Sequence, residues 1–334
     1  MRRSALVFAS PGNVEVRQES TAAPSGDQVL VQTRYSAISA GTELMIYRGE
    51  APNEMPADES LTALSGSLKF PLRYGYAAVG EVIGLGAKAP SDLEGRTVFA
   101  FQPHASHFLA RPEELVPLPD ELPLEAALFL PNMESAVNFL HDGAPVAGDR
   151  VVVFGQGVVG LLTTALLARM ALSSLLTLDR YPIRREASQS IGAHQALDPS
   201  DADGLANVAG RADLAYELTG NPDALPQAIA ATGYDGRVVV GSWYGTRRAE
   251  LDLGGRFHRS RIKLLSSQVS SISPRLTGRW DKGRRLKFAL QMIQQMQPSG
   301  LITHRYPFEK AAEAYALLAE HPEQTIQVIL TYES

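Results

Sequence analysis

The chain has 334 residues, of which 45% are hydrophobic and 20% charged, and its formal net charge is −5. These values are typical of a globular protein with room for two domains, and the scattered lysines and arginines predict no nucleic-acid partner and no membrane-surface binding. Cysteine is absent, which excludes disulfides, thiolate zinc sites and a cysteine nucleophile.

The first part of the chain predicts strands separated by proline and glycine turns. The expected strands are 6–8, 14–17, 29–35, 75–83, 97–101 and 108–118. Residues 50–67 are small, polar and interrupted by proline, which predicts a surface loop. The N-terminal residues lack a long apolar core, so we expect no signal peptide and a cytoplasmic location. The longest apolar run, 161–172, is too short to span a bilayer.

Strands and helices alternate in the middle of the chain. Expected helices are 124–140, 184–191, 224–231, 285–296 and 309–319, and expected later strands are 214–217, 238–241 and 262–266. The alternation ends near residue 273, and a closing strand at 325–331 is expected to rejoin the first domain. We therefore predict a β domain from 1–122 and 273–334, with a nucleotide-binding domain, 123–272, inserted into it.

A glycine-rich stretch, VVVFGQGVVG, ends at Gly160 and is followed by an apolar, helix-favouring segment. A buried strand, a tight turn and a helix start in this order are typical of a dinucleotide-binding unit. Gly155 permits the turn, Gly157 lets the backbone approach a pyrophosphate, and Gly160 lets the helix pack closely on the strand. The N–H groups of Val158 and Val159 would face the phosphates at the positive end of the helix dipole.

Asp179 ends the next expected strand, roughly 20 residues beyond Gly160, which is the position of an acid that binds the adenosine ribose hydroxyls. Its carboxylate repels a 2′-phosphate and so favours NAD as the cofactor. Arg180, Arg184 and Arg185 could receive such a phosphate, which leaves NADP possible.

Three further residues follow the fourth and fifth strands of the predicted parallel sheet: Thr219, Gly241 and Ser242. Because ligands bind at the carboxyl ends of such strands, we expect these residues to border the nicotinamide. Trp243 and Tyr244 come next and form either an apolar wall of the site or part of the core.

Four motifs together resemble the medium-chain dehydrogenase/reductase superfamily, whose best-known members are the zinc alcohol dehydrogenases. They are GTE at 41–43, GYAAVG at 75–80, the glycine-rich unit and TIQVIL at 325–330, and the resemblance covers essentially the whole chain. It implies an α/β fold in which a Rossmann doubly wound parallel sheet is inserted into a GroES-like β domain, with a possible homodimer. Within the superfamily, SAISAGTE at 36–43 most resembles the branch that contains bacteriochlorophyllide dehydrogenase.

The zinc ligands of the superfamily do not carry over to this chain. Where zinc members have Cys-Gly-Thr-Asp and Gly-His-Glu motifs, Ala40 and Tyr76 occupy the ligand positions, and the third ligand would fall near Asn132. We therefore expect no zinc and no other metal. The cations that bind pyrophosphate in the family are also replaced, by Gly41 and Gln327, with Arg180 or Arg305 as possible supplements.

Thr42 and Tyr76 are the catalytic candidates that the resemblance implies. Thr42 matches the hydroxyl residue of the proton relay, although it could equally finish a strand or cap a turn. Tyr76 occupies the lost histidine position, where its phenol either donates a hydrogen bond to a substrate carbonyl or only fills the volume of the metal.

His104 is the third catalytic candidate, in a turn that it shares with His107. It could act as a general acid, because imidazole titrates near neutral pH. The pair could instead bind a metal with Glu43 or Glu134, or bond to the local backbone. Glu134 and Asn132 either hydrogen-bond the substrate or the nicotinamide or have a capping role. The basic residues of 257–261 and 275–285 either attract an acidic substrate or form a solvated face.

These observations predict a zinc-independent oxidoreductase that transfers a hydride between NAD(P) and a small organic substrate, with a secondary alcohol and its ketone as the preferred pair. One alternative is an NADPH-dependent reductase of an activated C=C bond or a quinone. The other is a nucleotide-binding protein without catalysis.

Overall fold

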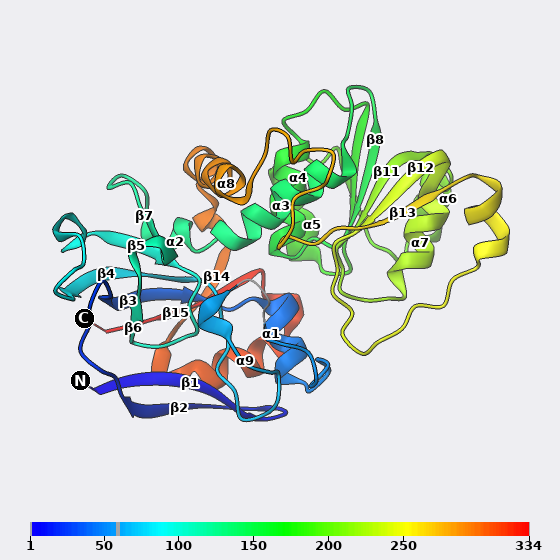
Figure 1. Ribbon diagram of the computed structural model, residues 1–334. Coiled ribbons are helices and arrows are strands. Elements are labelled where there is room, and N and C mark those ends of the chain that lie inside the picture. The colour runs from blue at the N-terminus through cyan, green and yellow to red at the C-terminus, as the bar shows by residue number, and fades with distance from the viewer. Residues whose placement is uncertain (1, 58–60, 334) are drawn as a thin grey trace. The chain divides into compact units, whose positions relative to one another are not determined.

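The computed structural model describes residues 2–57 and 61–333. It divides into two compact units (Figure 1): unit 1 contains Met1–Pro131 and Met292–Ser334, and unit 2 contains Asn132–Gln291. Helices α3 (Leu130–Gly143) and α8 (Lys282–Met296) continue through the two points where the chain passes between the units. These points lie later in the sequence than the expected domain limits after residues 122 and 272.

Unit 1 is built on a mixed seven-stranded sheet in the order β14-β15-β3-β4-β5-β7, with β6 paired to β3, and on a separate β1–β2 ribbon. Its strands are β1 (Arg2–Ser10), β2 (Asn13–Ser20), β3 (Val29–Ala37), β4 (Ala78–Leu85), β5 (Thr97–Ala100), β6 (His107–Ala110), β7 (Leu115–Pro117), β14 (Ile302–Pro307) and β15 (Gln327–Thr331). Its α-helices are α1 (Ala40–Tyr47), α2 (Leu124–Ala127) and α9 (Ala311–Glu320). Its short helical turns are η1 (Thr62–Leu64), η2 (Ser91–Leu93), η3 (Pro112–Glu114), η5 (Pro298–Leu301), η6 (Phe308–Lys310) and η7 (Pro322–Gln324).

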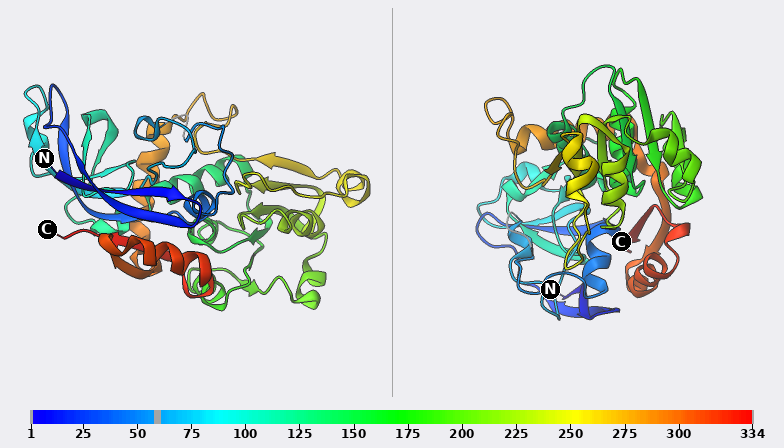
Figure 2. Two further views of the ribbon diagram at one scale, coloured as in Figure 1. Left: turned by 90° about the horizontal axis from the view of Figure 1, so that it is seen from below. Right: turned by 90° about the vertical axis from the view of Figure 1, so that its right-hand side faces the viewer.

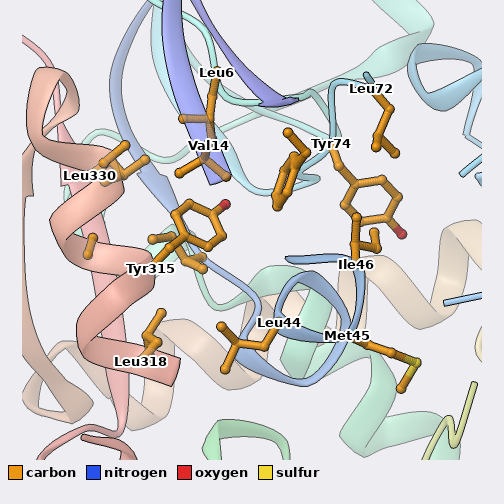
Figure 3. Packing of buried hydrophobic residues seen from close by; sticks show 14 of the residues in the cluster. Leu6, Val14, Leu44, Met45, Ile46, Leu72, Tyr74, Tyr315, Leu318 and Leu330 are labelled. Atoms are coloured by element: carbon orange, nitrogen blue, oxygen red, sulfur yellow. The ribbon is translucent and has the colours of Figure 1, made fainter. Parts of the chain in front are cut away.

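The main core of unit 1 lies where β1, β2, α1, α9 and β15 meet. Helix α9 packs beside the β1–β2 ribbon, as the left view in Figure 2 shows. Leu6, Val14, Leu44 and Leu330 surround the Tyr315 ring (Figure 3). Apolar residues from both ends of the chain share this core, and the closing strand β15 pairs with β3. The last strand of the chain therefore lies in the same unit as the first strands, where the sequence analysis expected it.

Parts of unit 1 differ from the elements expected from the sequence. Residues 40–47, which had no predicted helix, form α1, whose apolar residues pack into the core described above. The expected strand 108–118 is broken by the turn η3, because Pro112 lacks the N–H that a continuous strand pair would use. The expected helix 124–140 is two helices, and Pro131 lies in the first turn of the second, where its missing N–H costs nothing.

Unit 2 is a six-stranded parallel sheet in the order β10-β9-β8-β11-β12-β13. Its strands are β8 (Arg150–Phe154), β9 (Ser174–Leu178), β10 (Gln195–Leu197), β11 (Ala212–Glu217), β12 (Thr232–Val240) and β13 (Lys263–Ser266). Its other helices are α4 (Val158–Leu167), α5 (Pro182–Ser190), α6 (Ala202–Val208), α7 (Ala224–Ala231) and the π-helical turn η4 (Leu253–Phe257). This strand order is that of the dinucleotide-binding doubly wound sheet, which confirms the predicted fold class.

Across 2–57 and 61–333, no helix has the combined length and apolar character that crossing a membrane would require.

Candidate functional site

The glycine-rich turn between β8 and α4 has a distinct geometric requirement at each glycine. Gly155 has φ +89°, and a Cβ there would lie 2.6 Å from the Leu218 carbonyl oxygen. A Cβ on Gly160 would lie 2.0 Å from the Gly155 carbonyl oxygen, so only glycine allows this approach of helix to turn. A Cβ on Gly157 would meet no atom within 4 Å. The side of the turn at Gly157 is therefore open to a ligand.

This turn lies at the point where the strand order of the sheet reverses. Strand β8 pairs with β9 on one side and with β11 on the other, and ligands of doubly wound sheets bind at this switch point. Gly157 is the N-cap of α4. Because the first N–H groups of a helix have no intrahelical acceptor, those at Val158 and Val159 are available to an anion. The residues present fit a pyrophosphate.

Asp179 follows β9, and its buried carboxylate lies against the glycine turn. Its Oδ2 accepts a hydrogen bond from the backbone N–H of Gln156 at 2.8 Å, and its Oδ1 accepts one from the N–H of Tyr181 at 2.9 Å. The Arg184 guanidinium lies 4.0 Å from the same carboxylate. Burial lowers the pKa of Arg184, and the Asp179 charge opposes that effect. The structure therefore places the Asp179 carboxylate directly against the glycine turn, and its contact with an adenosine ribose stays a prediction.

The three arginines that could receive a 2′-phosphate have different surroundings. Arg185 donates both to the Asp179 carbonyl oxygen and to the Asp198 carboxylate, each at 2.8 Å. Arg184 lies over the Tyr181 ring, 4.8 Å from its centroid. Arg180 is exposed, with its guanidinium 5.4 Å from the same centroid. Of the three, Arg180 is the most accessible to a ligand phosphate.

Glu217, which was not among the site residues predicted from the sequence, organises the carboxyl ends of β11 and β12. Its fully buried carboxylate accepts a hydrogen bond from the Thr219 N–H at 2.8 Å and short hydrogen bonds from the Thr219 and Tyr244 hydroxyls. Burial raises the pKa of Tyr244, and the adjacent Glu217 charge raises it further. The sequence feature that could have indicated this cluster is an acidic residue in the last position of a mainly apolar strand segment, LAYE.

Gly241 and Ser242 have structural roles that the sequence did not show. A Cβ on Gly241 would lie 2.4 Å from Cζ of Phe139, so this glycine allows α3 to pack on the sheet. The Ser242 hydroxyl accepts a hydrogen bond from the Gly220 N–H at 2.8 Å and joins the ends of the two strands. Contact of Thr219, Gly241 and Ser242 with a nicotinamide stays a prediction.

In unit 1, the candidates Thr42 and Tyr76 lie near the start of α1. Thr42 is in the first turn of this helix and partly exposed. Tyr76 is also partly exposed, and its hydroxyl forms a short hydrogen bond with Ser39, the N-cap residue of α1. The Ser39 hydroxyl was not selected from the sequence. Together these residues place hydroxyl groups at one end of a short helix.

His104 was expected to act as a catalytic acid, but the structure gives it a buried position. Its side chain has no exposure, its Nδ1 lies 2.7 Å from Ser36 Oγ, and its Nε2 lies 3.0 Å from Glu43 Oε2. Both ring nitrogens are therefore occupied within unit 1, which favours a positioning role over contact with a substrate. The sequence suggested Glu43 and His104 together only as possible metal ligands. In the structure they form a hydrogen-bonded pair.

Several other candidates have partners within their own unit. Gln327 is buried and donates to the Ile38 carbonyl oxygen at 3.0 Å. Arg305 donates hydrogen bonds to both carboxylate oxygens of Glu125. The guanidinium that was considered for phosphate binding therefore already has an anionic partner. Among the residues that the structure describes, no group of three or more histidines, aspartates and glutamates could hold a metal ion. Zinc independence stays a prediction.

Glu134 and Arg285 form an ion pair in unit 2 that is fully buried at the arginine and mostly buried at the glutamate. Arg285 is 1% exposed and donates to Glu134 Oε1 from Nη2 at 3.0 Å, and also to Asn138 Oδ1. From the sequence, Arg285 belonged to a basic run that was expected either to attract an acidic substrate or to form a solvated face. It is instead on the buried stripe of α8 with Ala289 and Ile293, which are spaced four and eight residues from it.

Comparisons with known proteins agree with this architecture. The family described as "Glucose dehydrogenase C-terminus" matches residues 133–331, more than half of the chain. D-guloside 3-dehydrogenase of Escherichia coli K12 is 23% identical over 98% of this chain and 99% of its own. The uncharacterized zinc-type alcohol dehydrogenase-like protein YphC of the same organism is 24% identical over 95% of this chain and 96% of its own.

A crystal structure described as a short chain alcohol dehydrogenase (rspB) from Escherichia coli CFT073, complexed with NADH, has a TM-score of 0.80 with 17% identity and 99% of each chain covered. The closer resemblance to a bacteriochlorophyllide dehydrogenase branch stays a prediction. The family match and the two-unit fold confirm the superfamily that the motifs indicated. The chain belongs to the medium-chain, zinc alcohol dehydrogenase-like superfamily, whose members are NAD(P)-dependent oxidoreductases.

Proposed function

We propose that this protein is an NAD-linked oxidoreductase that interconverts a secondary alcohol and its ketone without a metal ion. The observation that carries this proposal is the Asp179 carboxylate, bonded to the backbone of the glycine turn at the switch point. A dinucleotide there would have its pyrophosphate beside Gly157 and the N-terminus of α4, and its ribose beside Asp179. The nicotinamide of the bound cofactor supplies or accepts the hydride.

The names of similar proteins support this choice of chemistry. A D-guloside 3-dehydrogenase is similar over nearly the whole chain, and a substrate rich in hydroxyl groups is consistent with alcohol oxidation. The structurally similar Escherichia coli CFT073 enzyme holds NADH. We also propose a homodimer and a cytoplasmic location, which rest on the sequence analysis alone.

The hydroxyl groups at the start of α1 take the place of a metal in this proposal. Tyr76, at a superfamily ligand position, donates a hydrogen bond to the carbonyl oxygen of a ketone and withdraws charge from it. Thr42 supplies a second hydroxyl in the same part of unit 1. Preorganised donors of this kind stabilise the negative charge that develops on the oxygen during hydride transfer.

Replacing Tyr76 by phenylalanine tests the proposal together with a substrate screen. With NADH or NAD, wild type is expected to turn over secondary alcohols or ketones, and Tyr76→Phe is expected to lower kcat roughly 100- to 1,000-fold, the effect of removing one oxyanion donor. The measurement is NADH absorbance against panels of alcohols, ketones, enones and quinones, each with both cofactors. Cofactor binding without hydride exchange in any panel would instead support a non-catalytic nucleotide-binding protein.

An NADPH-dependent reductase of activated C=C bonds or quinones is the second candidate, and exposed Arg180 is the observation that favours it. This arginine follows Asp179 directly and could pair with a 2′-phosphate. Turnover of enones or quinones with NADPH, without turnover of alcohols, would select this candidate.

Asp179→Asn is expected to shift the cofactor preference from NADH towards NADPH. The change removes the charge that repels a 2′-phosphate; the amide oxygen still accepts the Gln156 N–H, and the Tyr181 N–H loses its acceptor. A hydrogen bond to a charged group contributes about 1.5–3 kcal/mol, which predicts a roughly 10- to 100-fold loss of NADH affinity. The measurement is the ratio of kcat/KM for the two cofactors. Asp213→Asn removes a carboxylate charge of unit 2 that pairs with Arg150, which is not a candidate for phosphate binding, and serves as the control. An unchanged ratio would show that Asp179 does not face the ribose.

A further inference from the structure

Two hydroxyl groups in unit 1 touch each other directly. Ser39 Oγ and the Tyr76 hydroxyl form a short hydrogen bond, and both residues are partly exposed. Ser39 is the N-cap of α1, but its side chain makes no capping hydrogen bond to that helix. The Ser39 hydroxyl is therefore directed to Tyr76 and not to the backbone, which is the usual partner of an N-cap serine.

A buried glutamate–histidine pair holds the two segments that carry these hydroxyls. Glu43 Oε1 accepts a hydrogen bond from the Ser39 N–H at 2.8 Å, and Glu43 Oε2 lies 3.0 Å from His104 Nε2. The His104 ring packs beneath Gly75, where a Cβ would come within 2.6 Å of it. Gly75 directly precedes Tyr76 and has φ +117°. One pair of side chains thus fixes the backbone on both sides of the hydroxyl contact.

The glutamate–histidine pair is itself held from both ends. The Tyr315 hydroxyl donates a short hydrogen bond to Glu43, and Ser36 Oγ lies between His104 Nδ1 at 2.7 Å and the Tyr332 hydroxyl at 2.8 Å. Glu43, His104 and Ser36 have no exposure. A buried polar chain in which every member is satisfied is rigid, because breaking any link leaves an unpaired polar group.

We propose, on the basis of the proposed function above, that Ser39 works through Tyr76 as one hydroxyl unit and that Glu43 and His104 are its positioning residues. Ser39 donates to the Tyr76 oxygen, and Tyr76 donates to the substrate oxygen. A hydroxyl that accepts a hydrogen bond becomes a stronger donor, so the pair polarises a carbonyl more than either group alone.

The proton balance of ketone reduction follows this arrangement. As the hydride from the reduced nicotinamide reaches the carbonyl carbon, the carbonyl oxygen gains negative charge and takes the Tyr76 proton. Tyr76 recovers a proton from Ser39, and Ser39, which is partly exposed, takes one from water. The products are the alcohol and the oxidised nucleotide, and alcohol oxidation follows the same path in reverse.

A double-mutant cycle on Ser39 and Tyr76 tests this proposal with the substrate found in the screen. Ser39→Ala is expected to lower kcat about 10-fold or more, with unchanged NADH affinity, and to alter the solvent deuterium isotope effect on kcat. The double variant Ser39→Ala/Tyr76→Phe is expected to be no slower than Tyr76→Phe, because groups that act as a unit are not additive. Ser106→Ala, another partly exposed serine of unit 1 that accepts a hydrogen bond, is the matched control and should retain wild-type kcat.

The positioning residues need a variant that preserves the fold. His104→Gln retains an amide group that can reach Glu43, and it should recover most of the kcat that His104→Ala loses, with the same KM for NADH. If His104→Ala does not fold, the Ser39 and Tyr76 cycle still decides the proposal.

The outcomes separate this inference from the proposed function. Suppose that wild type turns over a substrate but the two changes lower kcat multiplicatively, or that Ser39→Ala has the kcat of wild type. Either result would overturn the hydroxyl unit and leave the oxidoreductase assignment in place. Absence of turnover by wild type in every panel would overturn the proposed function and this inference with it.

Discussion

Arg285→Met is expected to lower the free energy of unfolding by about 3–5 kcal/mol, the cost of removing one partner from a buried ion pair. Arg285 is 1% exposed, and its guanidinium donates to Glu134, to Asn138 and to the carbonyl oxygens of Ser271 and Val269. Methionine fills a similar volume but leaves the Glu134 carboxylate buried without its cation. The measurement is urea unfolding followed by circular dichroism.

The size of this loss is expected to increase with pH. Burial raises the pKa of Glu134 above its ordinary value of 4.5, and Arg285 opposes that shift. Below pH 4.5, the ordinary pKa, the Glu134 carboxyl is protonated in both the folded and the unfolded state and costs no stability. When folding raises the pKa of a carboxyl, the free energy of unfolding falls as the pH rises through the folded pKa. Without Arg285 the folded pKa rises further, so unfolding measured near pH 8 should show a larger difference between variant and wild type than unfolding near pH 4.5.

The neighbouring Arg284 provides the control for this prediction. Its guanidinium is exposed and lies 4.2 Å from the Trp280 ring centroid, so Arg284→Met should change stability by only about 0.5–1 kcal/mol. The double variant Glu134→Leu/Arg285→Met removes both charges and should recover part of the loss. Equal stability of Arg284→Met and Arg285→Met would contradict the assignment of Arg285 to the core.

Gly157→Ala and Gly160→Ala are expected to separate cofactor binding from folding. Gly157 has φ −65°, and a Cβ there would meet no atom within 4 Å, so alanine should leave the melting temperature nearly unchanged. It would, however, occupy the open side of the turn where a pyrophosphate approaches, and NADH affinity should fall at least about tenfold, equivalent to about 1.4 kcal/mol. The measurements are thermal melting and NADH fluorescence titration.

Gly160→Ala should lose stability as well as binding. Its Cβ would lie 2.0 Å from the Gly155 carbonyl oxygen, so helix α4 must move away from the turn. Overpacking of this kind costs typically 1–3 kcal/mol. Gly278→Ala, at a position where a Cβ meets no atom within 4 Å, is the control for glycine replacement itself. Wild-type NADH affinity in Gly157→Ala would show that no dinucleotide phosphate approaches this turn.

Elements with contiguous patterns could be predicted from the sequence. The strand, glycine turn and helix around Gly160 lie within one short stretch, as do the helices Lys282–Met296 and Ala224–Ala231. Helix α1 could not be predicted in this way. It has only eight residues and contains Gly41, and it is stabilised by burial of Leu44, Met45 and Ile46 and by Glu43, which binds the backbone of Ser39.

The sequence alone determined the parts of this protein whose physics is local: the glycine bend, the acid that follows the next strand, and the absence of the residues that hold zinc in the superfamily. Only the tertiary structure decided which distant side chains meet. Glu43 and His104 are 61 residues apart in the chain, Glu43 and Tyr315 are 272 apart, and Glu134 and Arg285 are 151 apart. Periodicity shows which face of an element is buried, but the partner of a buried polar group depends on how the elements pack, and no local pattern contains that information.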